Sequence, residues 1–170
     1  LKLLGLAGEG ALGVGELPPG LRELRLELRD APVALLDGGV RGVALLGAGC
    51  TKNPQAAESA RLINNERTRR GIRTAKLDVH LVNKAQNWAE HMARTGKVSH
   101  SVLSAGIGGN TNWRYLAENV GWARSVGEMH SLFMASAAHR SSMLDGRYSR
   151  VGTGVAIRNG RYYVVQVYGG

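Results

Sequence analysis

The aromatic residues of this sequence are confined to its second half, which limits where a hydrophobic core can form. All nine lie at or after Trp88, and residues 1–49 also contain no Ser, Thr, Asn, Gln, His, Ile or Met. Aromatic side chains supply much of the buried area of a core. Five glycines and a Pro-Pro pair interrupt residues 8–20, which is too often for a long helix. We therefore expect a low-complexity, weakly packed extension over residues 1–50 and one folded domain over residues 51–170.

The basic charge of the chain also belongs to the second segment. The formal net charge is +9, but residues 1–50 hold five basic and six acidic groups, or −1. Residues 51–170 hold 17 basic and seven acidic groups, or +10. A surplus of this size favours anionic partners such as nucleic acid, acidic envelope polymers or lipid headgroups. The sequence predicts no transmembrane helix, because it has no run of about 18 apolar residues.

A single cysteine, Cys50, separates the two segments. One cysteine excludes an intramolecular disulfide framework and a multi-cysteine zinc module. Residues 42–49 are apolar or small and resemble the end of a bacterial lipoprotein signal, in which the following cysteine receives the lipid. Gly47 stands where such signals usually carry a leucine-type residue, and Arg41 limits the apolar run to eight residues. Two interpretations stay open: lipid attachment at Cys50, and a free cysteine beside a linker.

Hydrophobic spacing in the second segment predicts helices first and a hairpin last. Apolar residues at helical spacing, each run closed by a glycine, predict helices over 56–70 and 78–95. Ser125 with Glu128 forms a capping box that begins a third helix, and the Gly- and Ser-rich stretch before it predicts a loop over 97–112. Asn159-Gly160 lies between two β-rich runs and predicts a hairpin, because both turn positions need a positive φ. The expected fold class is α+β.

Five histidines lie in the second segment, and three of them carry no sign of a site. His80, His91 and His130 form no histidine pair at the three- or four-residue spacing of a helical metal clip, so we expect surface or half-buried positions. His100 and His139 are far apart in sequence, with Glu118 between them. Two neutral imidazoles and a carboxylate that meet in the fold could bind zinc with an open position or perform acid–base chemistry.

Six segments between residues 58 and 168 follow one another in the order of a known family's motifs. They are residues 62–67 with Gly71, the helical positions 81–92, the His-Ser step at 99–101, the Glu-Asn segment at 117–120, the run 133–140, and the closing strands 151–155 and 163–168. Together they resemble the CAP superfamily, also called the SCP-like domain, in its bacterial form. The superfamily includes cysteine-rich secretory proteins, insect venom antigens and plant pathogenesis-related proteins.

The resemblance implies an α/β/α sandwich with a C-terminal antiparallel hairpin and a surface cleft. In the family, two histidines and two acidic residues gather in that cleft, and the histidines can hold zinc or another divalent ion. On this sequence His100, Glu118 and His139 take three of the four places. The resemblance thus implies His100 and His139 as the metal ligands. The place of the second acidic residue holds a serine, Ser136.

Further residues near these positions complete the expected cleft, namely Ser101, Asn119, Ser136 and Arg140. Glu128, His130 and Ser136 itself all stay open as the replacement for the missing acid. We expect Asn119 to bond backbone carbonyls. Ser101 and Ser136 would orient a histidine or contact a ligand, or cap a helix. Arg140 would hold a carboxylate or phosphate, or pair with a helix C-terminus.

The sequence leaves three functions open. The first is an exported, monomeric, extracellular or envelope-associated bacterial protein that binds lipid, wall polymer or another anionic envelope component without demonstrable catalysis, and that reaches a membrane only through a lipid on Cys50. The second is a zinc-dependent hydrolase with His100 and His139 on the metal and Glu118 as base. The third is nucleic-acid binding, prompted by a pI of 10.3. No zinc knuckle or aromatic-basic strand accompanies that charge, so no specific nucleic acid is expected.

Overall fold

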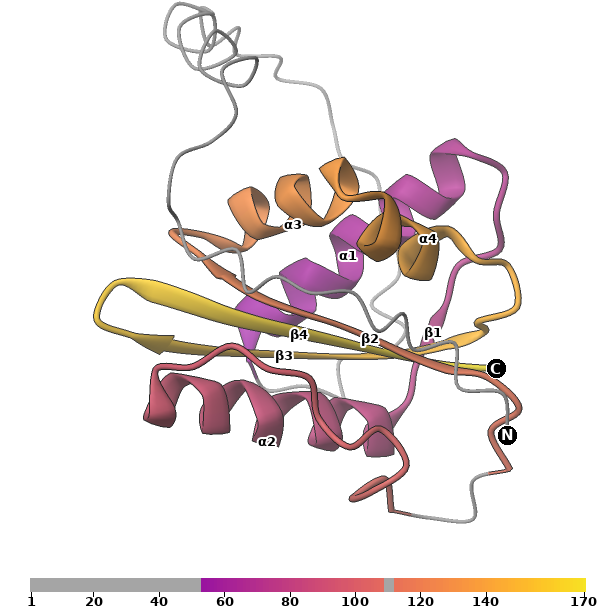
Figure 1. Cartoon of the computed structure of the whole chain (residues 1–170). Coiled ribbons are helices and arrows are strands. Elements are labelled where there is room, and N and C mark those ends of the chain that lie inside the picture. The colour runs from indigo at the N-terminus through magenta and orange to yellow at the C-terminus, as the bar shows by residue number, and fades with distance from the viewer. Residues whose placement is uncertain (1–52, 109–111) are drawn as a thin grey trace, which may run out of the picture. The chain divides into compact units, whose positions relative to one another are not determined.

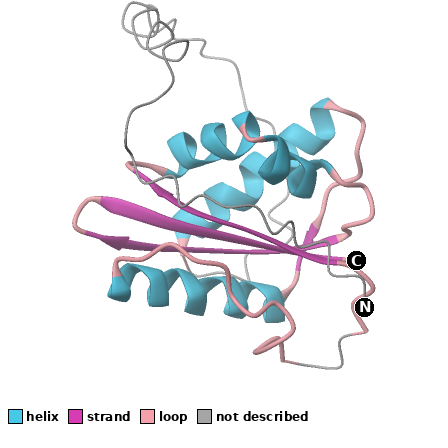
Figure 2. Cartoon of the chain, viewed as in Figure 1, coloured by secondary structure: helices cyan, strands magenta, loops and turns pink. Residues whose placement is uncertain are grey.

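The computed structural model describes residues 53–108 and 112–170. The expected extension, Cys50 and the end of the expected loop at 109–111 lie outside the described residues. The helices are α1 (Pro54–Arg69), α2 (Val79–Thr95), α3 (Val126–Ala135) and α4 (Ala137–Leu144). The strands are β1 (Lys76–Leu77), β2 (Leu116–Ala123), β3 (Arg150–Arg158) and β4 (Arg161–Gly169). Figure 1 shows their course along the chain, and Figure 2 distinguishes helices, strands and loops.

The strands form one mixed sheet in the order β1-β3-β4-β2. β1 pairs with β3 in parallel, while β4 pairs antiparallel with both β3 and β2. The predicted hairpin is confirmed: β3 and β4 are joined by Asn159 and Gly160, whose φ angles of 51° and 71° are both positive. β2 therefore lies at the edge of the sheet, next to the second strand of this hairpin.

Helices cover both faces of the sheet, which confirms the expected α/β/α sandwich. α2 lies on one face and α1, α3 and α4 lie on the other (Figure 1). Between α2 and the sheet, apolar residues such as Leu81 and Met92 pack against Val165 and Val167. The opposite cluster includes Phe133 of α3. In the described ranges, none of the helices has the length and apolar character needed to span a bilayer.

Two glycines of β3 let α2 approach the sheet with its backbone. A Cβ atom added at Gly152 would lie 2.0 Å from the carbonyl carbon of Leu81, and one at Gly154 would lie 2.3 Å from that of Ala85. Real Cβ atoms essentially never come so close to backbone atoms. Glycine inside a strand often marks such an approach of another backbone. The two glycines thus set the distance between α2 and the sheet.

A buried arginine, Arg67, joins α1 to the loop that follows α4. Its side chain is fully buried, and Nε donates to the carbonyl of Arg73 at 2.8 Å. Nη1 donates to the carbonyls of Met143 and Asp145 at 3.0 and 3.1 Å, and Nη2 to that of Tyr148 at 2.8 Å. Burial lowers the pKa of Arg67. Because its acceptors are backbone carbonyls, the guanidinium fixes the course of the chain rather than neutralising an acid.

The third helix begins where its capping box predicts, and it ends at Ala135. The Ser125 hydroxyl accepts the Glu128 N–H at 3.0 Å, while the Glu128 carboxylate accepts the N–H of Arg124, one residue before the expected partner. His139 lies inside a separate helix, α4. Ser136 divides the two helices, because its φ and ψ of −83° and 122° are extended rather than helical.

Candidate functional site

Glu118 of β2 holds the loop that carries His100. Its carboxylate is 0% exposed and accepts three hydrogen bonds. The Ser101 N–H and the Ser101 hydroxyl donate at 2.8 and 2.7 Å, and His100 Nδ1 lies 3.0 Å from Oε1. A carboxylate can only accept, so Nδ1 of His100 carries the proton and Nε2 is left for other partners. The imidazole itself is 63% exposed.

Two side chains of α2 also hold the loop that carries His100. Lys84 is buried, and its Nζ donates to the carbonyls of Val102 and Ala105 at 2.8 and 2.6 Å. Trp88 Nε1 donates to the carbonyl of Ser99 at 2.7 Å. Burial lowers the pKa of Lys84, and the charge of Glu118 acts in the opposite direction. Lys84 was not among the residues predicted from the sequence, although its place three residues after Leu81 on a helix face that is otherwise apolar was a usable signal.

His139 of α4 approaches from the other helical layer. Its ring packs against Phe133 with centroids 4.9 Å apart. Asn119 Nδ2 donates to the His139 carbonyl at 3.1 Å and to Gln166 Oε1 at the same distance, as expected for a residue that bonds the backbone. Gln166 in turn donates to Ser59 Oγ of α1 at 3.1 Å. This buried network fixes the start of α4 against the sheet and against α1.

The two imidazoles of the site are shifted in opposite directions. The hydrogen bond to Glu118 raises the pKa of His100. Burial lowers the pKa of His139, and the positive charge of His100 lowers it further, which places the two rings in one electrostatic environment. When their surroundings push the pKa values of two groups apart, the group with the higher pKa serves as the proton donor and the other as the acceptor. A pH range therefore exists in which His100 is a charged donor and His139 a neutral acceptor.

The pairing with Glu118 predicts a pH dependence of stability that a single substitution removes. In metal-free buffer, Glu118→Gln is expected to lower the pKa of His100 toward its ordinary value of 6.5. Because pairing raises the folded-state pKa, its stabilising contribution is fully present below pH 6.5 and is lost as the pH rises through the folded-state pKa. The difference in unfolding free energy between wild type and variant is therefore expected to be larger in the acidic part of this range.

Proton NMR titration of His100 and urea unfolding at several pH values measure the two effects. The pKa of His139 is followed in the same spectra, because the charge of His100 contributes to lowering it. An unchanged pKa of His100 in Glu118→Gln would contradict the role assigned to the carboxylate.

Among the described residues, the others expected in the cleft make no side-chain hydrogen bond or ion pair with Glu118 or the two imidazoles. Arg140 Nη1 donates to the carbonyl of Met134 at 2.7 Å, which is the second of its two expected roles, pairing with a helix C-terminus. Glu128 pairs with Arg124. His130 has a buried Nδ1 without a hydrogen-bond partner among the described residues, and burial lowers its pKa, while the charge of Glu66 of α1 acts in the opposite direction. Ser136 occupies the N-cap of α4 without a side-chain capping bond.

The site offers few side chains that could bind a metal ion. In residues 53–108 and 112–170, no three His, Cys, Asp or Glu side chains are grouped so that they could hold a metal ion. Both oxygens of Glu118 already accept hydrogen bonds, which leaves the imidazoles of His100 and His139. A histidine that donates Nδ1–H to a carboxylate is typical of metal ligands, but zinc sites have three or four protein ligands. The two imidazoles are fewer than the protein ligands of a zinc site.

This chain matches both a protein-family model and several solved structures. A model of the cysteine-rich secretory protein family, CAP, matches residues 60–168. The comparison with curated protein sequences found no match. An outer surface protein from Borrelia burgdorferi is similar in structure, with a TM-score of 0.61 and 11% identity. The similarity covers 70% of this chain and 94% of that protein.

Two proteins of other bacteria share the fold over part of their length. A cysteine-rich secretory protein from Staphylococcus aureus has a TM-score of 0.56 and 24% identity, and the similarity covers 77% of this chain and 41% of that one. An extracellular protein containing an SCP domain from Bacillus anthracis has a TM-score of 0.55 and 19% identity, with 68% and 40% covered. Identities this low establish the fold alone.

Proposed function

Because this chain belongs to the cysteine-rich secretory protein (CAP) family, we propose that it is an exported bacterial envelope protein that binds a polar wall component at His100, Glu118 and His139. Among proteins of similar structure, one is an outer surface protein and another is extracellular, which supports a location outside the cell. The surplus of basic groups in residues 51–170 suits a surface that meets an anionic envelope.

The observation that carries the proposal is an exposed imidazole, His100, held by a buried carboxylate, with a second imidazole, His139, whose pKa responds to the charge of the first. Glu118 fixes His100 through Nδ1 and leaves the outer part of an exposed ring available. His139 lies in the same electrostatic environment with a lowered pKa. A donor beside an acceptor suits hydroxyl, amide or carboxylate groups, which wall glycans and their peptides carry. Such a pair is less suited to the apolar chain of a lipid.

The contacts of the site favour binding over hydrolysis. Ser101 Oγ donates to Glu118 Oε2, so its proton is held by a carboxylate already bound by two other donors. A serine nucleophile instead needs a base that takes its proton toward the reacting centre. Glu118 is likewise committed to holding the loop, which leaves it poorly placed to serve as a general base. We therefore propose a binding role without catalysis.

Binding to purified peptidoglycan sacculi, stripped of phosphate polymers, tests the proposal. The variant His100→Gln/His139→Gln is expected to bind about tenfold more weakly than wild type in a co-sedimentation assay, because it loses a charged donor and its neighbouring acceptor. The matched control is His80→Gln/His91→Gln, which removes two histidines that do not contact Glu118. The control is expected to bind as wild type does.

Four outcomes would contradict this proposal. The control could lose as much binding as the test variant, or neither variant could differ from wild type. Wild-type protein could also co-sediment with phosphatidylcholine vesicles and not with sacculi, which would indicate a lipid ligand. Steeply salt-dependent binding to duplex DNA, with no affinity for sacculi, would favour a nucleic-acid role instead.

A weakly held divalent ion is a second candidate feature of the same site. The hydrogen bond between His100 Nδ1 and Glu118 favours it, because that bond orients the ring for a metal at Nε2. His100 and His139 would hold the ion, and a bound ion would polarise an oxygen of the ligand.

Chelation is expected to have little effect on the folded protein. EDTA should lower the melting temperature by about 2 °C or less, because weak binding to the native state adds little free energy and the core does not depend on the ion. Calorimetric titration with zinc should detect binding to wild type and none to His100→Ala/His139→Ala. Equal zinc binding by both proteins would exclude these ligands, and complete unfolding by EDTA would contradict the weak affinity.

A further inference from the structure

The hairpin of β3 and β4 extends to one end of the domain, where three helix ends also lie. In Figure 1 its turn lies at the left, with the start of α1, the end of α2 and the start of α3. The contacts agree with this view, because Asn53 Nδ2, at the N-cap of α1, donates to the carbonyl of Val155 at 2.7 Å, and Arg158 reaches the end of α2. β2 ends there as well, since Ala123 lies opposite Tyr162. We call residues 93–97, 122–125 and 156–162 the hairpin end.

The hairpin end carries a surplus of positive charge. Its basic residues are all exposed, namely Arg94, Lys97, Arg124, Arg158 and Arg161. Arg124 pairs with Glu128, and the other four form no ion pair within residues 53–108 and 112–170. With Glu58 and Glu90 of the adjoining helices also counted, five basic groups stand against three acidic ones. This surplus attracts an anionic partner.

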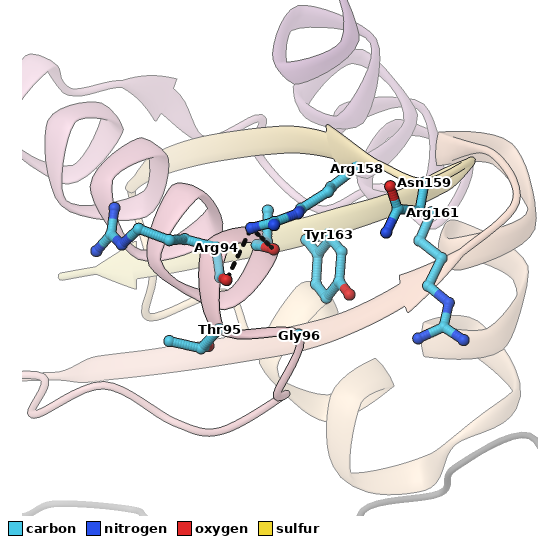
Figure 3. A pocket seen from close by; sticks show the side chains of 8 residues that line it. Arg94, Thr95, Gly96, Arg158, Asn159, Arg161 and Tyr163 are labelled. Atoms are coloured by element: carbon cyan, nitrogen blue, oxygen red, sulfur yellow. Dashed lines mark hydrogen bonds between the residues drawn. The ribbon is translucent and has the colours of Figure 1, made fainter.

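The guanidinium groups of the hairpin end are spread apart rather than gathered at one point (Figure 3). Arg158 Nη1 donates to the carbonyls of Ala93 and Arg94 at 3.4 and 2.8 Å, and these neutral acceptors leave its charge in place. The side chain of Arg94 points away from that of Arg161, whose guanidinium carbon lies 4.3 Å from the centre of the Trp122 ring. This arrangement does not enclose a single anionic group. It suits an extended surface that carries many of them.

Apolar side chains lie beside these charges. Ile157 is 51% exposed, and it is one of the few large apolar side chains that the described residues leave in solvent. Tyr162 lies opposite it on β4 and is half-buried, as is Trp122 beneath Arg161. Tyrosine and tryptophan are enriched where proteins meet the headgroups of a bilayer, because their rings are partly apolar and partly polar. Apolar groups among the charges favour a lipid surface over a wall polymer, which offers charge without an apolar layer.

We propose that the hairpin end docks on the surface of an anionic lipid bilayer. Its basic groups contact the headgroups, while Ile157 and the aromatic rings reach the boundary with the acyl chains. The chain enters the domain at the same end, because α1 begins there, and Cys50 lies three residues before Asn53 in the sequence. A lipid on Cys50 would therefore bring the hairpin end to the bilayer. This contact of the protein itself goes beyond the expectation that such a lipid is the sole link to a membrane.

Co-sedimentation of the full, unlipidated chain with phosphatidylglycerol and phosphatidylcholine vesicles tests this proposal. Binding is expected to phosphatidylglycerol alone and should weaken with added salt, which screens the charges. Arg94→Gln/Arg161→Gln is expected to bind about tenfold or more weakly, because each basic residue near the surface contributes. Ile157→Ser keeps the charge and should weaken binding several-fold. The matched control, Arg61→Gln/Arg73→Gln, removes the same charge from two exposed arginines of α1 and the loop after it, and is expected to bind as wild type does.

Phosphatidylglycerol with a spin-labelled headgroup shows which end of the domain docks. It should broaden the amide NMR signal of Gly160 and leave that of Gly146, in the loop after α4 at the other end of the domain, sharp (Figure 1). Equal binding to phosphatidylcholine, equal loss in the control variant, or broadening of Gly146 instead of Gly160 would overturn the proposal. Binding to soluble poly(glycerol phosphate) without binding to vesicles would indicate a wall polymer instead. His100→Gln/His139→Gln should bind the vesicles as wild type does, so failure in the sacculi assay leaves this inference standing.

Discussion

Gly154→Ala is expected to destabilise the fold by about 3 kcal/mol or more. The new Cβ atom would meet the carbonyl carbon of Ala85 at 2.3 Å and its oxygen at 2.4 Å. Both are backbone atoms of α2, so no side-chain rotation relieves the clash. The helix would have to move off the sheet, and Leu81 and Met92 would lose their packing against β4.

Urea unfolding measures this loss, and another glycine of the chain provides the control. Gly127 lies in the first turn of α3, where an added Cβ would meet only the Ser125 hydroxyl at 4.0 Å. Gly127→Ala should leave stability unchanged or raise it slightly, because alanine is the better helix former. If Gly154→Ala unfolds within about 1 kcal/mol of wild type, the backbone approach of α2 does not limit this position.

Arg67→Met is expected to cost about 4 kcal/mol or more, which makes it the second large effect. The substitution keeps much of the buried volume but removes the donors to the carbonyls of Met143, Asp145 and Tyr148. Each buried acceptor left without a partner costs about 1–3 kcal/mol. Arg67→Lys should recover only part of the loss, because one ammonium group cannot reach every acceptor of the planar guanidinium.

The control for Arg67 lies two residues further along the same helix. Arg69 has a side chain that is 70% exposed and forms an ion pair with Glu66. Exposed pairs contribute about 1 kcal/mol or less, so Arg69→Met should change stability by no more than that. Calorimetric melting of both variants provides the comparison. Equal melting temperatures for Arg67→Met and Arg69→Met would show that the buried guanidinium does not hold the loop after α4.

Residue spacing predicted those parts of the fold that depend only on neighbouring residues, namely the hairpin turn and the end of α2. Asn159-Gly160 needs a left-handed backbone, and Gly96 ends α2 with a φ of 70°. β2 escaped prediction because six of its eight residues are buried, so the strand shows no alternation of polar and apolar positions. α4 was not predicted as a separate helix, because Ser136 alone interrupts a stretch that otherwise has the pattern of one helix.

The candidate site shows the same limit in another form. His100 and Glu118 are 18 residues apart, and their hydrogen bond depends on the path of a loop that no periodicity describes. Only the likeness to a family's motifs placed His139 with them. Neither the residue spacing nor the family likeness predicted Lys84. Its amino group binds backbone carbonyls, and a sequence does not show which carbonyls will lie near it.

Glu118 and Asn119 also determine how β2 is aligned. They are neighbours on an edge strand, opposite Val167 and Gln166 of β4, and their side chains bond to groups on opposite sides of the sheet. A slip of one residue would turn both side chains over, separating the carboxylate from Ser101 and the amide from Gln166. Misaligned forms therefore lose both sets of partners together. Two residues of the candidate site region, Glu118 and Asn119, thus also select a single alignment of the edge strand during folding.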